Sequence, residues 1–549
     1  METTRKHGSY GTVRAQSPRT AAGTLPSEAV TILELTSSCS TSATRLNVDV
    51  LVLAAAHIDQ TPVLLTDGVV TQGLDLTALA TALPTTGFTG ELDAVIRVPS
   101  SVLGSDARAV RADSLLIVGT GPGLAAGSGD DTALGADRAG VLRRAAGCAA
   151  RELSGTGSAA FLLPADDVDD LRAVTEGALV GAYAWSGRVP APTAPLGRVV
   201  VATALADSVE ASAAEARAIA LAEATALARD LVNEPPNRLT PQTFTQRARA
   251  VADDAGLDIE VLDEALLREQ GFGGIVGVGQ GSVHPPFLVR VSWVPENPAQ
   301  RIALIGKGIT FDSGGLSLKP PASMPEMKSD MAGAATVLGA VLAAARLELG
   351  VRVDAWLALA ENMPTADAQR PSDIVTMRDG TTVEVTNTDA EGRLVMADAL
   401  ARAIEDKPDC VLDIATLTGA QIIALGDRVS GVMGTPPLRD EVARCAAEAG
   451  EAFWPMPLPE HLRSALETPF AGLRNADISS RAGGMLVAGL FLREFVGDVP
   501  WAHLDIAGPA YNEKSPWGAT PVGGTGAGLA TLLALLSDRG RRPPSEPLR

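Results

Sequence analysis

Short apolar runs of strand length alternate along this chain with alanine-rich segments of helical length. The runs VTILELTSS, DVLVLAAA, SLLIVGTG and RVVVATAL fall between residues 29 and 205, and GVLRRAAGCAARELSG among them has a helical pattern. From residue 301 onward the alternation resumes with RIALIGKG, VDAWLALAE, DCVLDIATL and WAHLDIAG. Strands that alternate with helices pair in parallel, and the helices then cover both faces of the sheet. The pattern therefore predicts an α/β fold with a mixed, mostly parallel sheet.

One long alanine-rich helical pattern at residues 208–232 divides the chain into two regions. The segment NEPPNRLTP follows it, and proline cannot continue a helix. A chain of 549 residues is long enough for two domains, each with its own core. We therefore expect, in order, a disordered tail at 1–28, an N-terminal α/β domain at 29–205, a connecting helix at 206–232, a larger α/β domain at 233–536 and a flexible tail at 537–549.

The charge balance argues against nucleic acid and anionic membranes as partners. The chain has 45 Lys and Arg against 65 Asp and Glu, a formal net charge of −20, and no local basic patch. Its most apolar segment, Met331 to Ala345, is shorter than the ~18 residues that a membrane span requires and is closed by Arg346. We expect this segment to be a buried helix. The four cysteines lie far apart without CxxC spacing, which predicts reduced thiols in the cytoplasm.

Charged residues gather where the predicted strands of the larger domain end. In parallel α/β sheets, ligands bind at these carboxyl ends. RIALIG runs into a glycine-rich segment, TTVEV runs into NTDAEGR, and Asp330 falls in the first turn of a predicted helix, where the dipole favours a carboxylate. The charged candidates are Lys307, Asp312, Lys319, Asp330, Asp389, Glu391 and Arg393. Four carboxylates in one pocket would repel one another, so the pattern predicts divalent cations: Mn, Mg or a pair of Zn ions.

Each of these charged residues also has an ordinary alternative. A single Asp in a loop usually shapes a turn or caps a helix. The lysines could be surface residues, and Glu391 and Arg393 could be a solvated pair of small energetic value. Glu361 and Asn362, which end the VDAWLALA run, are assigned to a turn rather than to metal binding. Spacing alone leaves both interpretations open.

Five segments resemble the signature blocks of the leucyl aminopeptidase family, the two-metal cytosolic exopeptidases of peptidase family M17: KGITFDSGGLSLKP, MKSDMAGAA, ENMP, NTDAEGRLVMADAL and ATLTGA. NTDAEGRL is the hallmark octapeptide of that family. LVNEPPNRLTP, AGGMLVAGLFLREFV and WAHLDIAG also match, so the resemblance covers about residues 230–530. It implies a variable N-terminal α/β domain, a connecting helix, a catalytic metallopeptidase domain at 233–536 and assembly as a homohexamer.

The resemblance also implies a ligand set for two divalent metal ions, Mn or Zn, with Mg as a further candidate. One ion would be held by Asp312, Asp389 and Glu391. The second would be held by Lys307, Asp312, Asp330 and Glu391. Lys319 and Arg393 match the catalytic pair of the family, in which bicarbonate sits on the arginine. The positions that contact the peptide match Lys319, Met327, Thr416, Leu417 and Gly419.

The activity that the resemblance implies is hydrolysis of the first peptide bond of a peptide with a free N-terminus, releasing leucine and other mainly apolar residues. The five histidines lie outside the charged segments, which fits a mechanism in which a bound ion moves the proton. The rival interpretations are a DNA-binding or regulatory member of the same family and a Mg-dependent phosphoryl-transfer enzyme. The net charge opposes the first, and no GxxxxGK[ST] phosphate loop supports the second.

One position departs from the family pattern. After Gly483 and Gly484, relatives usually carry a small residue followed by Ile-Thr, in a segment that borders the pocket for the first side chain of the substrate. This chain has Met485, Leu486 and Val487. If Met485 faces that pocket, the pocket is shallower and more apolar, and Met485→Ala would favour bulky aromatic N-terminal residues over leucine. The alternative is that Met485 packs in the core beneath the pocket.

Overall fold

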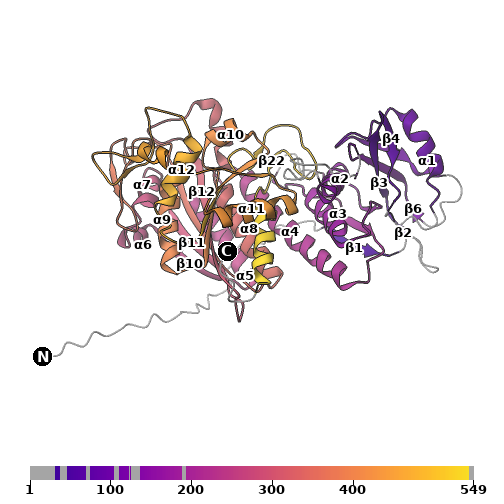
Figure 1. Ribbon diagram of the computed structural model, residues 1–549, viewed down its shortest axis with the longest axis horizontal. Helices are drawn as coiled ribbons and strands as arrows, with labels where there is room; N and C mark the ends of the chain where they lie inside the picture. The colour runs from indigo at the N-terminus through magenta and orange to yellow at the C-terminus, as the bar shows by residue number, and fades with distance from the viewer. Residues whose placement is uncertain are drawn as a thin grey trace.

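The structure, a computed structural model, describes residues 31–37, 46–67, 69, 74–103, 110–122, 124, 137–187 and 193–542. Figure 1 shows a smaller α/β body, formed by the N-terminal part of the chain, beside a larger body formed by the rest. The tail predicted at residues 1–28 lies outside the described residues.

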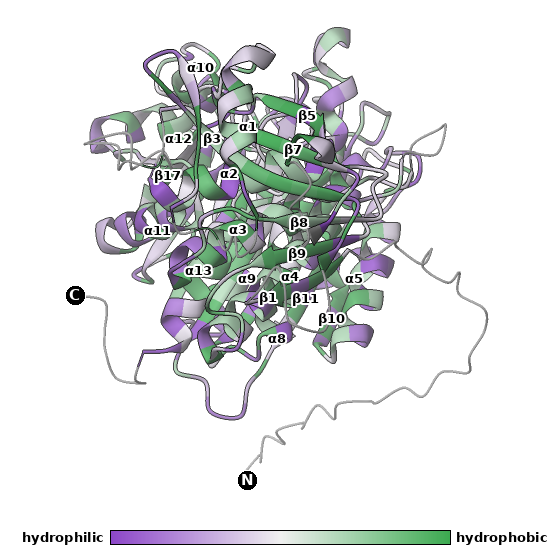
Figure 2. Cartoon of the chain, turned by 90° about the vertical axis from the view of Figure 1, so that its right-hand side faces the viewer, coloured by the Kyte–Doolittle hydropathy of each residue, from purple (hydrophilic) through white to green (hydrophobic). Residues whose placement is uncertain are grey.

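The smaller body has a seven-stranded sheet. Its elements are β1 (Ile32–Thr36), β2 (Leu46–Asn47), β3 (Val50–Ile58), β4 (Thr61–Leu64), α1 (Thr77–Ala82), β5 (Val95–Pro99), β6 (Val110–Arg111), β7 (Ser114–Gly119), α2 (Arg138–Glu152), β8 (Ser158–Phe161), α3 (Val168–Gly181) and β9 (Arg198–Ala202). The strand order is β1-β9-β8-β3-β7-β5, with β4 paired to β3. β4 and β5 run antiparallel to their neighbours, and the other pairs are parallel. Figure 2 shows hydrophobic residues concentrated on β5, β7, β8 and β9. One face of β7, β8 and β9 packs against α2 and α3, whereas the side chains of β5 pack in the core on the other face of the sheet.

The larger body has an eight-stranded sheet with helices on both faces. Its elements are α5 (Pro241–Ala255), β10 (Asp258–Leu262), α6 (Glu264–Glu269), α7 (Gly273–Gly279), β11 (Phe287–Trp293), β12 (Arg301–Asp312), α8 (Ala332–Arg346), β13 (Arg352–Asn362), β14 (Ile374–Thr376), β15 (Thr382–Glu384), α9 (Gly392–Glu405), β16 (Cys410–Ala415), α10 (Gly419–Leu425), β17 (Ser430–Gly434), α11 (Pro436–Ala449), β18 (Phe453–Pro455), β19 (Leu473–Arg474), α12 (Gly484–Arg493), β20 (Trp501–Asp505), β21 (Tyr511–Asn512), β22 (Gly523–Gly524) and α13 (Leu529–Gly540).

The strand order of this sheet is β10-β11-β13-β12-β16-β20-β17-β18. The central strands β13, β12, β16 and β20 are parallel to one another, and antiparallel pairs occur toward both edges. The predicted fold class, α/β with a mixed and mostly parallel sheet, is confirmed. Because the central strands are parallel, their carboxyl ends meet at one edge, and the charged segments of the sequence lie there.

Helix α8 is the buried helix that the sequence predicts at residues 331–345. Its side chains are almost all buried between the sheet and the other helices of that face. Glycine is required near its start, because a Cβ at Gly333 would lie 2.1 Å from the carbonyl oxygen of Ile414 in β16. The absence of a side chain at Gly333 thus lets the start of α8 lie directly against β16. No helix in the described part of the chain is both long and apolar enough to cross a membrane.

Helix α4 (Val209–Asn233) lies between the two bodies and contacts both. Ser208 caps it, accepting a hydrogen bond from the backbone N–H of Ala211. Arg229, which is fully buried, donates to the backbone carbonyls of Val180, Ala519 and Thr525. One guanidinium therefore joins the end of α3 to the last loop of the larger body. The domain boundaries themselves stay predictions.

The flexible tail predicted from residue 537 is wrong for its first residues, because α13 continues to Gly540. Arg539 is fully buried, its guanidinium 2.6 Å from a carboxylate oxygen of Glu441, and it donates to Gln300. The charged sequence DRGRR has the composition of a solvated end. Arg539 can nevertheless be buried, because it pairs with Glu441, a carboxylate distant in the sequence. Residues 543–549 lie outside the described residues.

Candidate metal centre

Three carboxylates from separate elements come together at the carboxyl edge of the larger sheet. Asp312 ends β12, Asp330 precedes α8 and Glu391 is the N-cap of α9. Each offers an oxygen within 4.8 Å of the others, and all three side chains are buried. Two other groups of potential ligands occur among the described residues, Asp166 with its neighbours and Cys445 with its neighbours, but both include exposed members. The buried group is therefore the stronger candidate for a metal site.

The charges of this cluster are compensated by two lysines. Lys307 Nζ lies 2.8 Å from Asp330 Oδ1 and 2.9 Å from Glu391 Oε1. Lys319 Nζ lies 2.8 Å from Asp312 Oδ2 and 2.6 Å from an oxygen of Asp389. Asp389 thus joins the cluster through Lys319.

Even with these lysines, the cluster is short of positive charge. Burial, together with the neighbouring carboxylates Glu391 and Asp330, raises the pKa of Asp312 to about 8. Burial also raises the pKa of Asp330 to about 6. For Glu391, burial opposes ionisation, but Lys307 and Lys319 outweigh it and lower the pKa. A divalent cation would allow all the carboxylates to ionise together.

Two oxygen atoms show where such a cation fits. Asp330 Oδ2 and Glu391 Oε2 are buried and have no hydrogen-bond partner among the described residues. Buried carboxylate oxygens without partners are costly, whereas they are ordinary ligands of divalent ions. The residues present therefore fit a divalent metal.

The structure corrects the predicted local positions of two candidate residues. Lys307 lies inside β12 and not at the end of a strand, because β12 continues through an irregular register to Asp312. Asp330 lies outside the first turn of α8: it ends the short 3₁₀ helix η5 (Pro325–Ser329) and precedes the N-cap Met331. Its Oδ1 accepts hydrogen bonds from Lys307 and from Thr416 Oγ1. These contacts, with Lys307 of β12 and with Thr416 after β16, fix the position of Asp330. They join segments distant in the sequence, so local helix propensity does not predict them.

Asn362 is a functional candidate that the sequence assigned to a turn. It is the last residue of β13, 2% exposed, and its Nδ2 donates to Asp312 Oδ1 at 2.8 Å and to the Thr388 carbonyl at 3.0 Å. Asn362 therefore orients one carboxylate of the cluster and ties it to the NTDAEGR segment. Glu361 does not join the cluster; it accepts hydrogen bonds from Ser282 and His284.

We expect Asn362→Ala to weaken metal retention by about 10–100-fold without unfolding the protein, because hydrogen bonds that orient a ligand contribute to metal affinity to this extent. The measurement is metal content after dialysis against a graded series of chelator concentrations. Asn297→Ala, which removes an exposed asparagine outside the site, is the matched control. Identical retention in the two variants would contradict the positioning role of Asn362.

Arg393 lies in the first turn of α9, beneath the cluster. It is partly buried, burial lowers its pKa to about 10, and it donates to the Asn475 carbonyl. Its Nε has no hydrogen-bond partner among the described residues. Next to it in the fold, Asp505 of β20 accepts from the Leu417 backbone N–H and from Thr418 Oγ1. Asn475 lies in none of the matching segments, and WAHLDIAG, which contains Asp505, matches the family without pointing to this role.

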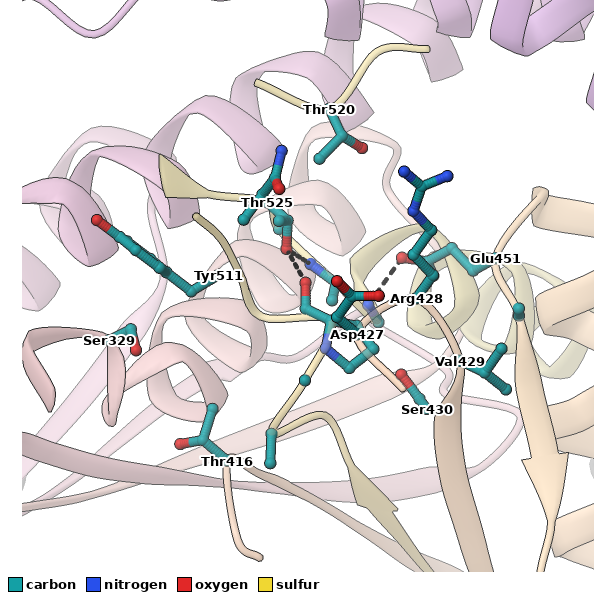
Figure 3. Close-up of a pocket in the computed structure, with 18 of the residues that line it drawn as sticks. Ser329, Thr416, Asp427, Arg428, Val429, Ser430, Glu451, Tyr511, Thr520 and Thr525 are labelled. Atoms are coloured by element: carbon teal, nitrogen blue, oxygen red, sulfur yellow. Dashed lines mark hydrogen bonds between the residues drawn. The ribbon is translucent and has the colours of Figure 1, made fainter. Parts of the chain in front are cut away.

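A cavity of about 820 Å³ contains the cluster. All five predicted metal ligands line it, together with four of the predicted substrate contacts beside Lys319: Met327, Thr416, Leu417 and Gly419. Helices α2 and α3 of the smaller body also contribute to its wall. Figure 3 shows this cavity with Ser329 and Thr416 on one side and Thr520 on the other. Arg393 does not line the cavity.

Met485 is placed in the core and does not line this cavity. It is 3% exposed, and a Cβ on Gly431 of β17 would lie 3.0 Å from its sulfur. The methionine begins α12 on the side that faces β17, so its flexible side chain fills the space above a glycine. The interpretation of Met485 as a substrate contact is therefore replaced by a packing role, and Met485→Ala is no longer expected to change the aromatic-to-leucine ratio.

The chain is similar to one protein family and to several individual proteins. The profile described as "Cytosol aminopeptidase family, catalytic domain" matches residues 226–533. A "Probable cytosol aminopeptidase" of Streptomyces avermitilis is 49% identical over 465 residues, covering 83% of this chain and 88% of that protein. One of Rhodococcus jostii is 47% identical over 500 residues, covering 89% and 95%. The solved structure of "Bottromycin maturation enzyme BotP in complex with Mn" is 39% identical with a TM-score of 0.76, covering 90% of this chain and 100% of BotP.

Proposed function

The chain belongs to the cytosol aminopeptidase family and is a metallo-aminopeptidase, and from this premise we propose that it removes N-terminal residues, mainly leucine and other apolar ones, with two divalent ions. The observation that carries the proposal is the buried group of Asp312, Asp330 and Glu391, in which two oxygens lack partners. One ion would be held by Asp312, Asp389 and Glu391, and the other by Lys307, Asp312, Asp330 and Glu391. The Mn named with BotP favours Mn, and Zn suits the same ligands.

Bound divalent ions would supply an activated water and a Lewis acid for the scissile carbonyl. Asp312 and Glu391 contribute to both ion sites, so their charges hold the two sites together. Lys307 must lose a proton to be a ligand. In the present structure burial lowers the pKa of Lys307, but the charges of Asp330 and Glu391 outweigh burial and raise it. A dication beside Lys307 would favour the neutral amine and so lower this pKa.

Lys319 is the residue that we assign to the developing oxyanion. In the structure its ammonium is bound to Asp312 and Asp389. Once these carboxylates hold an ion, Lys319 loses its partners and its charge is available to the substrate carbonyl. The Thr416–Gly419 segment, fixed by Asp330 at one end and by Asp505 at the other, would align the peptide beside it.

Arg393 is proposed to hold bicarbonate, which would carry the proton from water to the leaving amine. Its buried Nε without a partner supports a small anion there, because a buried N–H group without a hydrogen bond is costly. We also propose the homohexamer and the cytoplasmic location that the family resemblance implies; light scattering after size-exclusion chromatography tests the first.

Hydrolysis of a small panel of leucine derivatives tests the proposed function. The protein is stripped of metal, loaded with Mn or Zn, and supplied with leucine amide, N-acetyl-leucine amide and a phosphate monoester. We expect metal-dependent hydrolysis of leucine amide alone, because acetylation removes the free amine that an ion would bind. Equal hydrolysis of the acetylated compound, or turnover of the phosphate ester only, would refute the proposal.

A further inference from the structure

The cavity extends well beyond the metal ligands, and α10 forms one of its walls. Gly419 at the start of α10, Ile422 within it and Asp427 and Arg428 just after it all line the cavity. A seven-residue helix is about 10 Å long at 1.5 Å per residue. Figure 3 places Arg428 on the side of the cavity away from Thr416, near Thr520. Arg428 therefore lines the same cavity as the metal ligands, on a wall that Thr416 does not share.

Arg428 differs from every other Arg or Lys that lines the described part of this cavity. The others have partners: Lys307 and Lys319 pair with the metal-site carboxylates, Arg143 with Glu176, Arg144 with Asp93, Lys514 with Asp427, and Arg229 with backbone carbonyls. Arg428 is exposed and has no hydrogen-bond or ion-pair partner among the described residues. It is thus a free cation facing a cavity whose opposite end is acidic.

The guanidinium of Arg428 is nevertheless held in place by Trp517. Its central carbon lies 4.7 Å from the centroid of the Trp517 ring, and that of Arg144 lies 5.6 Å from the same ring. The ring sits on a tight turn closed by two backbone hydrogen bonds between Trp517 and Thr520. Asp93 anchors the turn, because it accepts from the Gly518 N–H and pairs with Arg144. A guanidinium held against a fixed ring loses little freedom when it binds.

We propose that Arg428 is a specificity-determining residue that binds a carboxylate of the substrate. The inference rests on the proposed function, in which the substrate amine lies at the metal end of the cavity. Guanidinium and carboxylate form paired hydrogen bonds, and the planar fork of Arg428 is the free group of that kind on this wall. The carboxylate has two sources: the C-terminus of a short peptide, or the side chain of an acidic N-terminal residue.

Two substrate pairs distinguish these sources. Leu-Gly-Gly against Leu-Gly-Gly amide differs in the terminal carboxylate, and glutamic acid α-amide against glutamine α-amide differs in the side-chain carboxylate. In Arg428→Ala we expect kcat/KM for the carboxylate member of one pair to fall about two- to fivefold relative to its partner, the range for an exposed charge pair. Arg428→Lys should retain part of the preference, and Arg428→Glu should reverse it.

Arg541→Ala is the control, because it removes the same charge from an exposed position outside the cavity. If neither ratio changes in Arg428→Ala while leucine amide is still hydrolysed, Arg428 does not bind a carboxylate and the aminopeptidase function stands. Titration calorimetry of the same four compounds in a Lys319→Ala background measures binding without turnover. It therefore decides the role of Arg428 even if the wild-type protein hydrolyses none of them, which would count against the proposed function alone.

Discussion

Glu391→Gln is expected to release bound metal and abolish activity while the protein remains folded. Glu391 contacts Lys307 and has a second oxygen without a partner, so both proposed ion sites depend on its charge. A neutral amide in its place would leave two dications under-neutralised, and we expect metal affinity to fall by more than about 100-fold, beyond the effect of an orienting residue. The apolar residues of α9 that pack on the sheet are unchanged.

Metal content by elemental analysis and folding by circular dichroism separate these two effects. Glu405→Gln provides a matched control, because it makes the same substitution at the exposed end of the same helix, where Glu405 pairs with Arg378. Equal metal content in Glu391→Gln and the wild-type protein would rule out Glu391 as a bridging ligand.

Lys319→Ala should behave in the opposite way, with metal retained and turnover lost. The proposed contact of Lys319 forms mainly with the oxyanion of the transition state, and removal of one such donor typically lowers kcat by about 10²–10³-fold. The expected signature is a fall in kcat with a much smaller change in KM. Removing the ammonium also leaves Asp312 and Asp389 without their cation, which should favour metal binding.

Steady-state kinetics on leucine amide, together with metal analysis of the same samples, tests this prediction. Lys407→Asn is a suitable control, since Lys407 is exposed and has a positive φ of 54°, a conformation that asparagine tolerates. A Lys319→Ala protein that loses metal as Glu391→Gln does would mean that Lys319 supports the site and not the transition state.

The sequence by itself determined the fold class, the family and the residues with the chemistry of a metal site. Apolar periodicity reports which faces of each element are buried, and this suffices for an α/β fold with a buried helix at α8. The segments around Asp312, Asp330 and Glu391 are contiguous motifs, so their chemistry can be recognised without knowing how they meet. The blocks that resemble the aminopeptidases identified the family that the comparisons then showed.

Only the tertiary structure decided which of these residues touch and which others support them. Asn362 reaches Asp312 because β13 lies beside β12, and Asp505 reaches Leu417 because β20 lies beside β16. Strand order and register are set by packing of the whole sheet, and a linear pattern of burial does not encode them. The same reason explains Met485: the sequence left open whether it lines the pocket or packs in the core, and its place beside Gly431 depends on where α12 packs. The wall that α2 and α3 add to the cavity was likewise decided by how distant segments pack, because their sequences carry only the signal of buried helices.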